Sequence, residues 1–561
     1  IAVDGLGRAV VFGDTRSPDF PTTPGAFDVS YNGGDPWGDA FVARLSADGA
    51  TLEYATFFGG EDAEVGFGGA LGADGAAYLT GWTRSDDFPT TPGAFDRSRN
   101  GGEDAFVVRL DAQGQLDYAT YLGGSASHPD PADEDYEFRP SGYDAGMAVA
   151  VDGREAIVLG STASANFPTS GGAADRSNLT YCYDRYTVYP CADAFITRLS
   201  ASGGQLVSST FLGGREDDFG RVLALDASGR AVVAGDSFSP DFPVTADAYD
   251  RTGGVDRDAF VARVSRTGGL VYATYLGGQD TADDGWYEGD RALALHVAGD
   301  GRVTVAGETW SRDFPTTPGA YDRTRNGWDC DTGWYDGPGQ CPDAYVVQFQ
   351  PDGALGFGTL LGGAGDTFGF AGYEAATAVE LDAAGNVVLA GYTGAADFPV
   401  TAGAYAAAPL TSQETFIARL NPIGQTLQYA TYLNSATGSS RVSLARAADD
   451  TLYLTGQTWS PGLPTTAGAW DTQLDGYAGD AFALKFRLDA PPLNAAWAEF
   501  GGGSATGGGI SANGGDSLRP ALVEAPDGTI YVAWSDASSG DAEIYVRRWR
   551  NGVWEEAGTG A

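Results

Sequence analysis

Apolar and polar residues alternate along short segments of this chain, and the segments recur in groups of four. A typical group starts with a run of small apolar residues such as Met147–Val151. A tight turn like Asp226–Gly229 then leads into a second run, which ends in Gly-x-Thr or Gly-x-Ser. The third and fourth segments begin at Asp-Ala-Phe and at Tyr-Ala-Thr-Tyr-Leu. Because a period of two is typical of half-buried strands, each group predicts four antiparallel strands.

Three motifs mark each group and keep the same order along the chain. Asp-Phe-Pro or a close variant is centred on Phe20, Phe88, Phe167, Phe242, Phe314, Phe398 and Leu463. Asp-Ala-Phe or a variant opens at Asp39, Asp104, Asp193, Asp258, Asp343, Glu414 and Asp480. Tyr-Ala-Thr-Tyr-Leu-Gly-Gly closes most groups, as at Tyr118–Gly124. Seven four-stranded units with no helical segment between them predict an all-β fold, a seven-bladed β-propeller.

The combined pattern Asp-Phe-Pro-Thr-Thr-Pro-Gly-Ala-Phe, then Asp-Ala-Phe-Val, then Tyr-Ala-Thr-Tyr-Leu-Gly-Gly resembles a known repeat family. It is similar to the SBBP-type repeat of bacterial β-propellers over about residues 1–500. The resemblance implies a propeller and an extracellular or cell-envelope setting. It implies no defined activity, so no functional residue is transferred from it.

The motif spacing divides the chain into blades and a tail. The predicted blades are 1–60, 61–124, 125–214, 215–278, 279–363, 364–435 and 436–500, and residues 501–561 form a partial second β-repeat domain. The seventh blade has no clear closing motif. We expect Ala495–Gly501 to supply its last strand, and a strand upstream of Ile1 is the alternative. The tail repeat begins at Trp497 and starts again at Trp554, so we expect it to continue beyond Ala561 or to pack elsewhere.

The composition restricts the partners. The chain has 75 acidic and 33 basic residues and a net charge of −42, and so acidic a surface repels nucleic acid and anionic lipid. No segment reaches the apolar length of a membrane helix, which excludes direct membrane insertion. The chain opens at Ile1 with no visible signal peptide, so we expect it to be processed or cut from a longer protein.

The four cysteines form two local pairs, Cys182 with Cys191 and Cys330 with Cys341. Neither pair has Cys-x-x-Cys spacing or a histidine nearby, so two disulfides are favoured over a zinc site. Disulfides indicate an oxidising compartment, and we therefore expect a secreted or cell-surface location. Asn178 opens an Asn-x-Thr glycosylation sequon in the first of these loops.

The length differences between units fall in loops that share one face of the predicted fold. These loops are Val29–Gly38, Ser125–Tyr143, Asn178–Ala192, Gln279–Asp290, Thr324–Pro342 and Ala364–Tyr373. Their aromatic residues form the candidate binding face: Tyr136, Tyr143, Tyr183, Tyr186, Trp286, Tyr287, Trp328, Trp334, Tyr335 and Phe370. Aromatic rings beside carboxylates suit sugars, whereas self-packing of the loops is the alternative.

Acidic runs suggest a hard cation such as calcium, although solvated acidic loops are the alternative. The candidate ligands are Asp130, Asp133, Asp135, Asp217, Asp218, Asp283 and Asp284. The variable residue of each Gly-x-Thr motif, such as Glu308 or Tyr392, is expected at the exposed mouth of the decorated face. A basic residue lies three positions after each Asp-Ala-Phe phenylalanine, Arg109 for example, with Gln348 as the exception, and it predicts a structural ion pair or a role on the sheet surface.

Catalytic signatures are weak. The chain has neither the zinc-protease nor the serine-hydrolase motif, and of its two histidines His128 lies in an acidic loop and His296 is assigned to a turn. We therefore expect a non-enzymatic adhesion or binding scaffold that contacts glycan or protein through the loops of blades three to six and requires no cofactor. The alternatives are a self-assembling subunit of an extracellular filament or surface layer, and a carbohydrate-active propeller enzyme.

Overall fold

The computed structural model describes residues 1–33, 38–47, 51–125, 142–176, 181–184, 187–254, 257–279, 289–326, 341–364, 373–433, 435, 442–446, 451–458, 480–486, 488, 517–536, 543–550 and 553–556. These residues form strands and turns, and no membrane-spanning helix is found among them. The chain divides into two compact units, Ile1–Leu276 and Gly277–Gly560.

Unit one contains four antiparallel sheets of four strands. The first has β1 (Ala2–Val3), β2 (Ala9–Thr15), β3 (Asp39–Leu45) and β4 (Leu52–Phe58). The second has β5 (Glu64–Leu71), β6 (Ala77–Thr83), β7 (Asp104–Leu110) and β8 (Leu116–Leu122). The third has β9 (Asp144–Asp152), β10 (Glu155–Thr162), β13 (Asp193–Leu199) and β14 (Leu206–Leu212), and the fourth has β15 (Asp218–Leu225), β16 (Ala231–Ser237), β17 (Asp258–Val264) and β18 (Leu270–Leu276). A separate hairpin, β11 (Tyr181–Asp184) and β12 (Thr187–Pro190), lies between β10 and β13 in the chain.

Unit two contains four further sheets. The fifth has β19 (Arg291–Val297), β20 (Val303–Thr309), β21 (Asp343–Phe349) and β22 (Leu355–Leu361), and the sixth has β23 (Glu374–Leu381), β24 (Val387–Thr393), β25 (Glu414–Leu420) and β26 (Leu427–Tyr432). The described part of the seventh has three strands, β27 (Ser443–Arg446), β28 (Leu452–Thr458) and β29 (Asp480–Phe486). The eighth has β30 (Ser517–Glu524), β31 (Ile530–Asp536), β32 (Glu543–Arg550) and β33 (Val553–Glu556).

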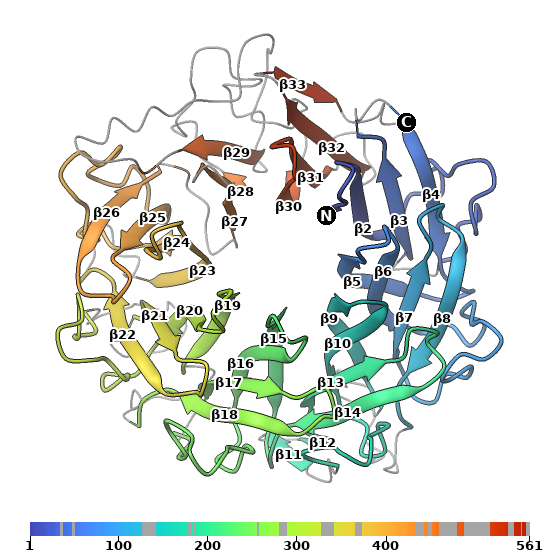
Figure 1. Cartoon of the computed structure of the whole chain (residues 1–561), viewed down its shortest axis with the longest axis horizontal. Helices are drawn as coiled ribbons and strands as arrows, with labels where there is room; N and C mark the ends of the chain where they lie inside the picture. Colours follow the sequence, from blue (N-terminus) through green and yellow to red (C-terminus); the bar gives the residue numbers. More distant parts are fainter. Residues whose placement is uncertain are drawn as a thin grey trace. The chain divides into compact units, whose positions relative to one another are not determined.

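Consecutive sheets within a unit pack face to face through their first strands. In unit one β5 contacts β2 and β9, and β9 contacts β15; in unit two β23 contacts β19 and β27, and β30 contacts β28 (Figure 1). The cores lie between neighbouring sheets, and one of them joins Val10 and Phe58 of the first sheet to Leu79 and Phe106 of the second. Four-stranded antiparallel sheets that pack in this manner are the blades of a β-propeller, so the predicted all-β propeller class is confirmed.

The predicted number of seven blades is wrong, because the tail forms an eighth sheet. Its apolar side chains Ile530, Val532, Trp534, Trp549 and Trp554 form one buried cluster with Tyr453 of the seventh sheet. The tail carries none of the three repeat motifs, so a count of motif copies stops at seven. Its large aromatic residues provide the core that those motifs provide elsewhere. The segment Ala495–Gly501 lies outside the described residues.

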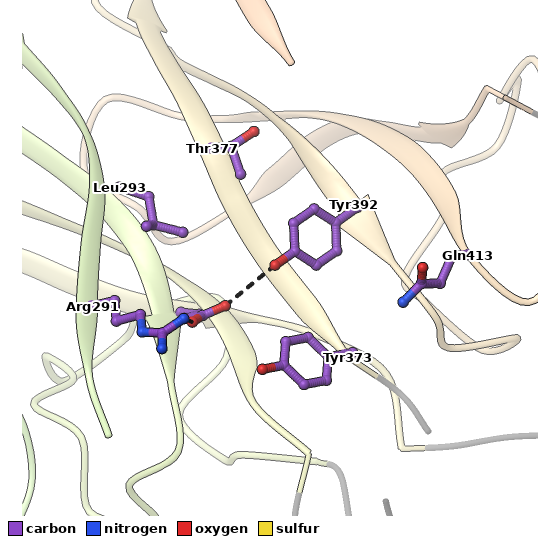
Figure 2. A pocket seen from close by; sticks show the side chains of 7 residues that line it. Arg291, Leu293, Tyr373, Thr377, Tyr392 and Gln413 are labelled. Atoms are coloured by element: carbon purple, nitrogen blue, oxygen red, sulfur yellow. Dashed lines mark hydrogen bonds and ion pairs between the residues drawn. The ribbon is translucent and has the colours of Figure 1, made fainter. Parts of the chain in front are cut away.

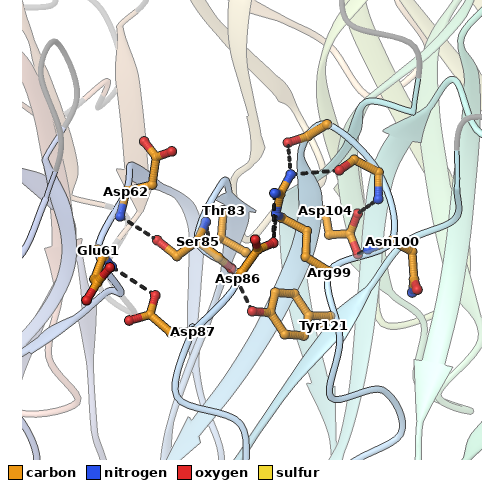
Figure 3. Close-up of polar contacts among 12 residues, drawn as sticks. Glu61, Asp62, Thr83, Ser85, Asp86, Asp87, Arg99, Asn100, Asp104 and Tyr121 are labelled. Carbon is orange, nitrogen blue, oxygen red and sulfur yellow. Dashed lines mark hydrogen bonds and ion pairs between the residues drawn. The ribbon is translucent and has the colours of Figure 1, made fainter.

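The motifs recur because they hold against each sheet the segment that links its second strand to its third, called the crossing segment below. The phenylalanine of Asp-Phe-Pro lies against the aromatic residue of Asp-Ala-Phe, with ring centroids 5.0 Å apart for Phe88 and Phe106 and 4.5 Å for Phe314 and Tyr345. The hydroxyl of Tyr121 donates a hydrogen bond of 2.6 Å to the carbonyl of Ser85 at the start of the crossing segment (Figure 3). These contacts fix the crossing segment against the sheet.

Candidate functional site

A pocket of about 450 Å³ opens between the fifth and sixth sheets in unit two. Its lining residues come from the strand ends of both sheets: Arg291, Leu293, Glu308, Tyr373, Thr377, Tyr392 and Gln413 (Figure 2). The volume is at the small end of the range for ligand pockets in proteins.

Two variable residues of the Gly-x-Thr motif form the polar centre of the pocket. Glu308 on β20 is paired in register with Arg291 on β19, and the Arg291 Nη1 atom lies 3.0 Å from Glu308 Oε1. Tyr392 occupies the equivalent position on β24, and its hydroxyl donates a hydrogen bond of 3.4 Å to Glu308 Oε2. The carboxylate of Glu308 therefore links the two sheets.

The aromatic side of the pocket is held by three rings. Tyr373, which precedes β23, stacks on Tyr392 with ring centroids 6.3 Å apart and planes 24° from parallel. The ring of Trp310 meets Tyr373 edge to face at 5.3 Å. The Trp310 main-chain N–H donates to Asp290 Oδ1 at 3.2 Å, which fixes the buried tryptophan. Because the neighbouring rings restrict Tyr373, its face is preorganised for stacking.

The charged groups of the pocket are paired with one another. Burial and the adjacent Glu308 carboxylate raise the pKa of Tyr392 above its usual range, so its phenol stays neutral. Arg291 balances the charge of Glu308, while its Nε–H is buried and makes no hydrogen bond. The amide of Gln413 adds a donor and an acceptor at the opposite side (Figure 2).

The burial of Glu308 and Tyr392 corrects one prediction. The variable residue of Gly-x-Thr was expected to be exposed, yet Trp82, Ser161, Asp236, Glu308, Tyr392 and Gln457 are all buried. Their side chains enter the space between sheets, where partners from the first strands meet them. Asp236, for example, pairs with Arg221 of β15 at 2.5 Å. The sequence shows variation at this position but does not show which side of the sheet it faces.

The structure describes two of the ten residues of the predicted binding face. Tyr143 is half-buried and packs beside Trp82 and Ala145, so it belongs to the contact between the second and third sheets. Tyr183 lies on β11, and its side chain is outside the described part. Tyr136, Tyr186, Trp286, Tyr287, Trp328, Trp334, Tyr335 and Phe370 lie outside the described residues.

Asp217 and Asp218 are the predicted metal ligands that the structure describes; Asp130, Asp133, Asp135, Asp283 and Asp284 lie outside the described residues. Asp217 accepts the N–H of Ala192 at 2.7 Å, and Asp218 is completely buried at the start of β15. Within the described part, Cys182, Cys191 and Glu216 form a group of three residues whose potential metal-binding atoms lie within 4.8 Å of one another. The two sulfurs of this group form a disulfide and are not available to a metal.

One predicted disulfide is confirmed. Cys182 and Cys191 are bonded across the β11–β12 hairpin, with their Cα atoms 5.1 Å apart. Cys341 is also disulfide-bonded, while Cys330 lies outside the described residues, as does Asn178 of the sequon. A buried disulfide of this kind indicates an oxidising environment of the extracellular type.

Five of the repeated basic residues, all arginines, form the ion pairs that the sequence predicts, and the Nζ of Lys485 lies 5.5 Å from the centroid of the Tyr453 ring. Arg44 pairs with Glu53 at 2.8 Å, Arg109 with Asp74 at 2.5 Å and Arg198 with Asp152 at 2.8 Å. His296 is not in a turn: it lies on β19 opposite Thr304, with its Nδ1 3.1 Å from Glu380 Oε2. The turn begins two residues later, where the Ala298 N–H donates to the Arg302 carbonyl.

Comparison with known proteins yields no family. No family model matches the chain, and no curated protein matches it. A polysaccharide lyase, Uly1, aligns with a TM-score of 0.35 at 10% identity over 82% of this chain and 87% of its own. A quinohemoprotein alcohol dehydrogenase from Comamonas testosteroni gives a TM-score of 0.33 at 10% identity over 81% and 73%. BamB from Moraxella catarrhalis gives 0.25 at 13% identity over 80% and 96%, and such low similarities carry no argument about function.

Proposed function

We propose that this chain is a non-enzymatic extracellular binding scaffold, and that the pocket between the fifth and sixth sheets binds one sugar unit of a glycan. The observation that carries the proposal is the stacked pair Tyr373 and Tyr392, which lines the same pocket as the Arg291 guanidinium and the Gln413 amide. A sugar ring presents C–H groups for an aromatic face and hydroxyl groups for fixed donors, and this pocket offers both.

Binding is favoured over hydrolysis by the lining of the pocket. Most glycoside hydrolases use two carboxyl groups, one as acid and one as base or nucleophile. Among the described lining residues Glu308 is the one carboxylate, and Arg291 and Tyr392 already hold it. A carboxylate held by an arginine and a phenol is suited to fixing the pocket and has little freedom to accept a proton from water.

The proposed extracellular setting has two further supports. The Cys182–Cys191 disulfide fits an oxidising compartment, and the resemblance to the SBBP-type repeat points to the cell envelope. The filament alternative relied on an unpartnered tail repeat. The eighth sheet instead packs against Tyr453 of β28, which removes that reason for preferring assembly.

A glycan array probed with the purified chain tests the proposal. We expect the parent to bind a subset of glycans, and Gln413→Ala and Tyr373→Ala to lose at least about tenfold in affinity, because each loses a ring contact or an amide hydrogen bond of ~1–2 kcal/mol. Tyr249→Ala is the matched control, since Tyr249 is an exposed tyrosine of unit one and should leave binding unchanged.

Two results would overturn the proposal. One is the absence of glycan binding by the folded parent. The other is binding by both pocket variants that equals binding by the parent, which would place any contact elsewhere. Incubation of bound glycans with the parent, followed by chromatography of the products, separates binding from hydrolysis. New reducing ends that disappear in Glu308→Gln would establish the enzyme alternative.

A further inference from the structure

The aspartate that opens Asp-Ala-Phe is buried in the second and third sheets, but its surroundings differ. Asp104 in the second sheet accepts hydrogen bonds on both oxygens, from the N–H of Gly101 at 3.0 Å and that of Asn100 at 2.9 Å (Figure 3). Asp193 in the third sheet is also completely buried, and neither of its carboxylate oxygens has a hydrogen-bond partner. A buried carboxylate without partners is costly, so Asp193 requires compensation of another kind.

The difference arises in the segment that precedes each aspartate. In the second sheet Asn100 and Gly101 turn their N–H groups toward Asp104 directly before β7. In the third sheet the β11–β12 hairpin and its disulfide occupy the corresponding part of the chain. The hairpin ends at Cys191, which is followed by Ala192, and the N–H of Ala192 is used by Asp217 at 2.7 Å. The inserted hairpin therefore takes the place of the segment whose N–H groups stabilise the equivalent aspartate, Asp104, in the second sheet.

A second buried carboxylate lies beside Asp193, because the main-chain N–H of Asp218 donates to the carbonyl of Ala192 at 2.6 Å. Asp218 at the start of β15 accepts the N–H of Gly214 and the hydroxyl of Ser239, both at 2.7 Å on Oδ2, and its Oδ1 has no hydrogen-bond partner. Gly213, which precedes Gly214, packs closely against the Asp193 carboxyl group, since a Cβ at Gly213 would lie 2.3 Å from Asp193 Oδ1. Between the first two sheets a glycine approaches both acids of the corresponding pair, since a Cβ at Gly59 would lie 2.6 Å from Asp39 Oδ1 and from Glu64 Oε2.

The surrounding charges are negative. Burial and then the charge of Asp218 raise the pKa of Asp193 well above its usual range, and Asp175, Asp217 and Asp241 add to the effect. Arg215, a neighbouring cation, is largely exposed and forms an ion pair with Asp241 at 2.7 Å. The site thus has a strongly negative potential, with no guanidinium donating a hydrogen bond to either Asp193 or Asp218 among the described residues.

We propose that Asp193 and Asp218 bind a hard divalent cation, of which calcium is the probe, at the junction of the third and fourth sheets. A proton shared by the two carboxyl groups is the alternative to a cation. It would form one hydrogen bond between them, and at least one of the three oxygens without a partner would still lack a hydrogen bond. A hard cation accepts several carboxylate oxygens at once and balances both charges. Backbone carbonyls and water complete the shell of such ions, so two carboxylates are sufficient for weak binding.

Isothermal titration of Ca²⁺ into the metal-free full chain tests this site. We expect binding with a Kd of ~10⁻⁴–10⁻³ M, the range typical of extracellular calcium modules, and a midpoint of thermal unfolding that rises with Ca²⁺ concentration. Asp193→Asn and Asp218→Asn should each weaken binding by at least about tenfold, because each removes a charged ligand. Asp104→Asn is the matched control, since this aspartate is equally buried but already has its donors, and its Ca²⁺ affinity should equal that of the parent.

The absence of Ca²⁺ binding by the folded parent would overturn the proposal. So would binding that persists unchanged in both Asp193→Asn and Asp218→Asn. A third contrary result is an Asp193→Asn variant that is more stable than the parent in metal-free buffer and in Ca²⁺ alike, which would show that the pair is neutralised by a proton. Circular dichroism of each variant confirms that it is folded, and the outcome is independent of the glycan pocket because that pocket lies in unit two.

Discussion

The ring of Phe167 lies 4.3 Å from the ring of Phe195, centroid to centroid, with an angle of 31° between the planes. Phe167 belongs to the segment that crosses the third sheet, and Phe195 belongs to β13 within it. Both side chains are almost completely buried. Phe242 and Phe260 repeat the arrangement in the fourth sheet at 4.4 Å, and Phe398 and Phe416 repeat it in the sixth at 4.7 Å. This contact is the common anchor of the crossing segments.

Replacement of Phe167 by alanine should therefore destabilise the chain by ~3–5 kcal/mol, because the substitution leaves a cavity between the crossing segment and β13. Thermal or guanidinium unfolding followed by circular dichroism measures the loss. Phe67→Ala is the control, since Phe67 is 44% exposed on β5 and should change the stability by less than ~0.5 kcal/mol. Equal effects of the two variants would contradict the anchoring role.

Arg109 should be sensitive to substitution. It is 2% exposed, its Nε donates to the hydroxyl of Tyr78 at 2.7 Å, and it pairs with Asp74 at 2.5 Å. Arg109→Ala is expected to cost ~1–3 kcal/mol, because it removes a buried side chain and the hydrogen bond that its guanidinium donates to the Tyr78 hydroxyl. Arg215→Ala removes an exposed pair with Asp241 and should cost at most ~1 kcal/mol in the same unfolding assay.

Arg109→Gln provides a further check on this ion pair. Gln348 occupies the equivalent position on β21, where its Oε1 accepts from Arg302 at 3.0 Å and its amide donates to Thr304 at 3.1 Å. A glutamine therefore fits this place in the sheet. We expect Arg109→Gln to be less destabilising than Arg109→Ala, and the reverse order would count against the packing described here.

The stability of the chain should fall as the pH rises through the neutral range. Burial raises the pKa of Glu64 from 4.5 to about 7 and that of Asp39 from 3.8 to about 6. The unfolded chain releases these protons at lower pH than the folded chain does, so the stabilisation is complete below about pH 4 and is lost as the pH approaches 7. Glu64→Gln should flatten this dependence by about 1–3 kcal/mol between pH 4.5 and 7. Unfolding midpoints across this range, in metal-free buffer, measure the effect; an unchanged slope in the variant would exclude Glu64 as its source.

Gly59 should not tolerate even the smallest side chain. A Cβ there would lie 2.6 Å from the carboxyl oxygens of Asp39 and Glu64, closer than a van der Waals contact allows. Gly59→Ala is expected to cost ~1–3 kcal/mol as the carboxyl groups are displaced. Gly5→Ala is the control, because nothing lies within 4 Å of a Cβ at Gly5. Both variants are compared by thermal unfolding, and similar midpoints would argue against a close approach at Gly59.

The repeat motifs could be interpreted from the sequence because their residues make similar contacts in several sheets. Phe88 packs on Phe106, Thr83 stands opposite Asp104 in the ladder, and Tyr121 reaches Ser85. The eighth sheet could not be counted in this way. Trp534, Trp549 and Trp554 build its core with different side chains, and the contact with Tyr453 is made between residues far apart in the chain.

The pocket could not be predicted from the sequence either. Glu308 and Tyr392 could be recognised as variable positions in a fixed frame, but the period of two gives only the alternation of faces and not which neighbour meets each face. Arg291 and Tyr373 stand outside the motifs. Arg291 meets Glu308 within the fifth sheet and Tyr373 meets Tyr392 beside the sixth, and the two pairs form one pocket only when these sheets are packed together. Likewise Asp218 lies within an acidic run and Asp193 opens an Asp-Ala-Phe motif, and only the packing of the third sheet on the fourth brings them together.

The pairing of β10 with β13 has a consequence for how this fold can diverge. Thr162 stands opposite Asp193 even though residues 163–192 include a whole disulfide-bonded hairpin, and Thr83 stands opposite Asp104 with only residues 84–103 between them. The pairing of the second and third strands thus does not depend on the length of the segment that links them. New sequence can be added there by evolution, or grafted there by an engineer, and selection can act on the added segment while the inherited framework stays constant.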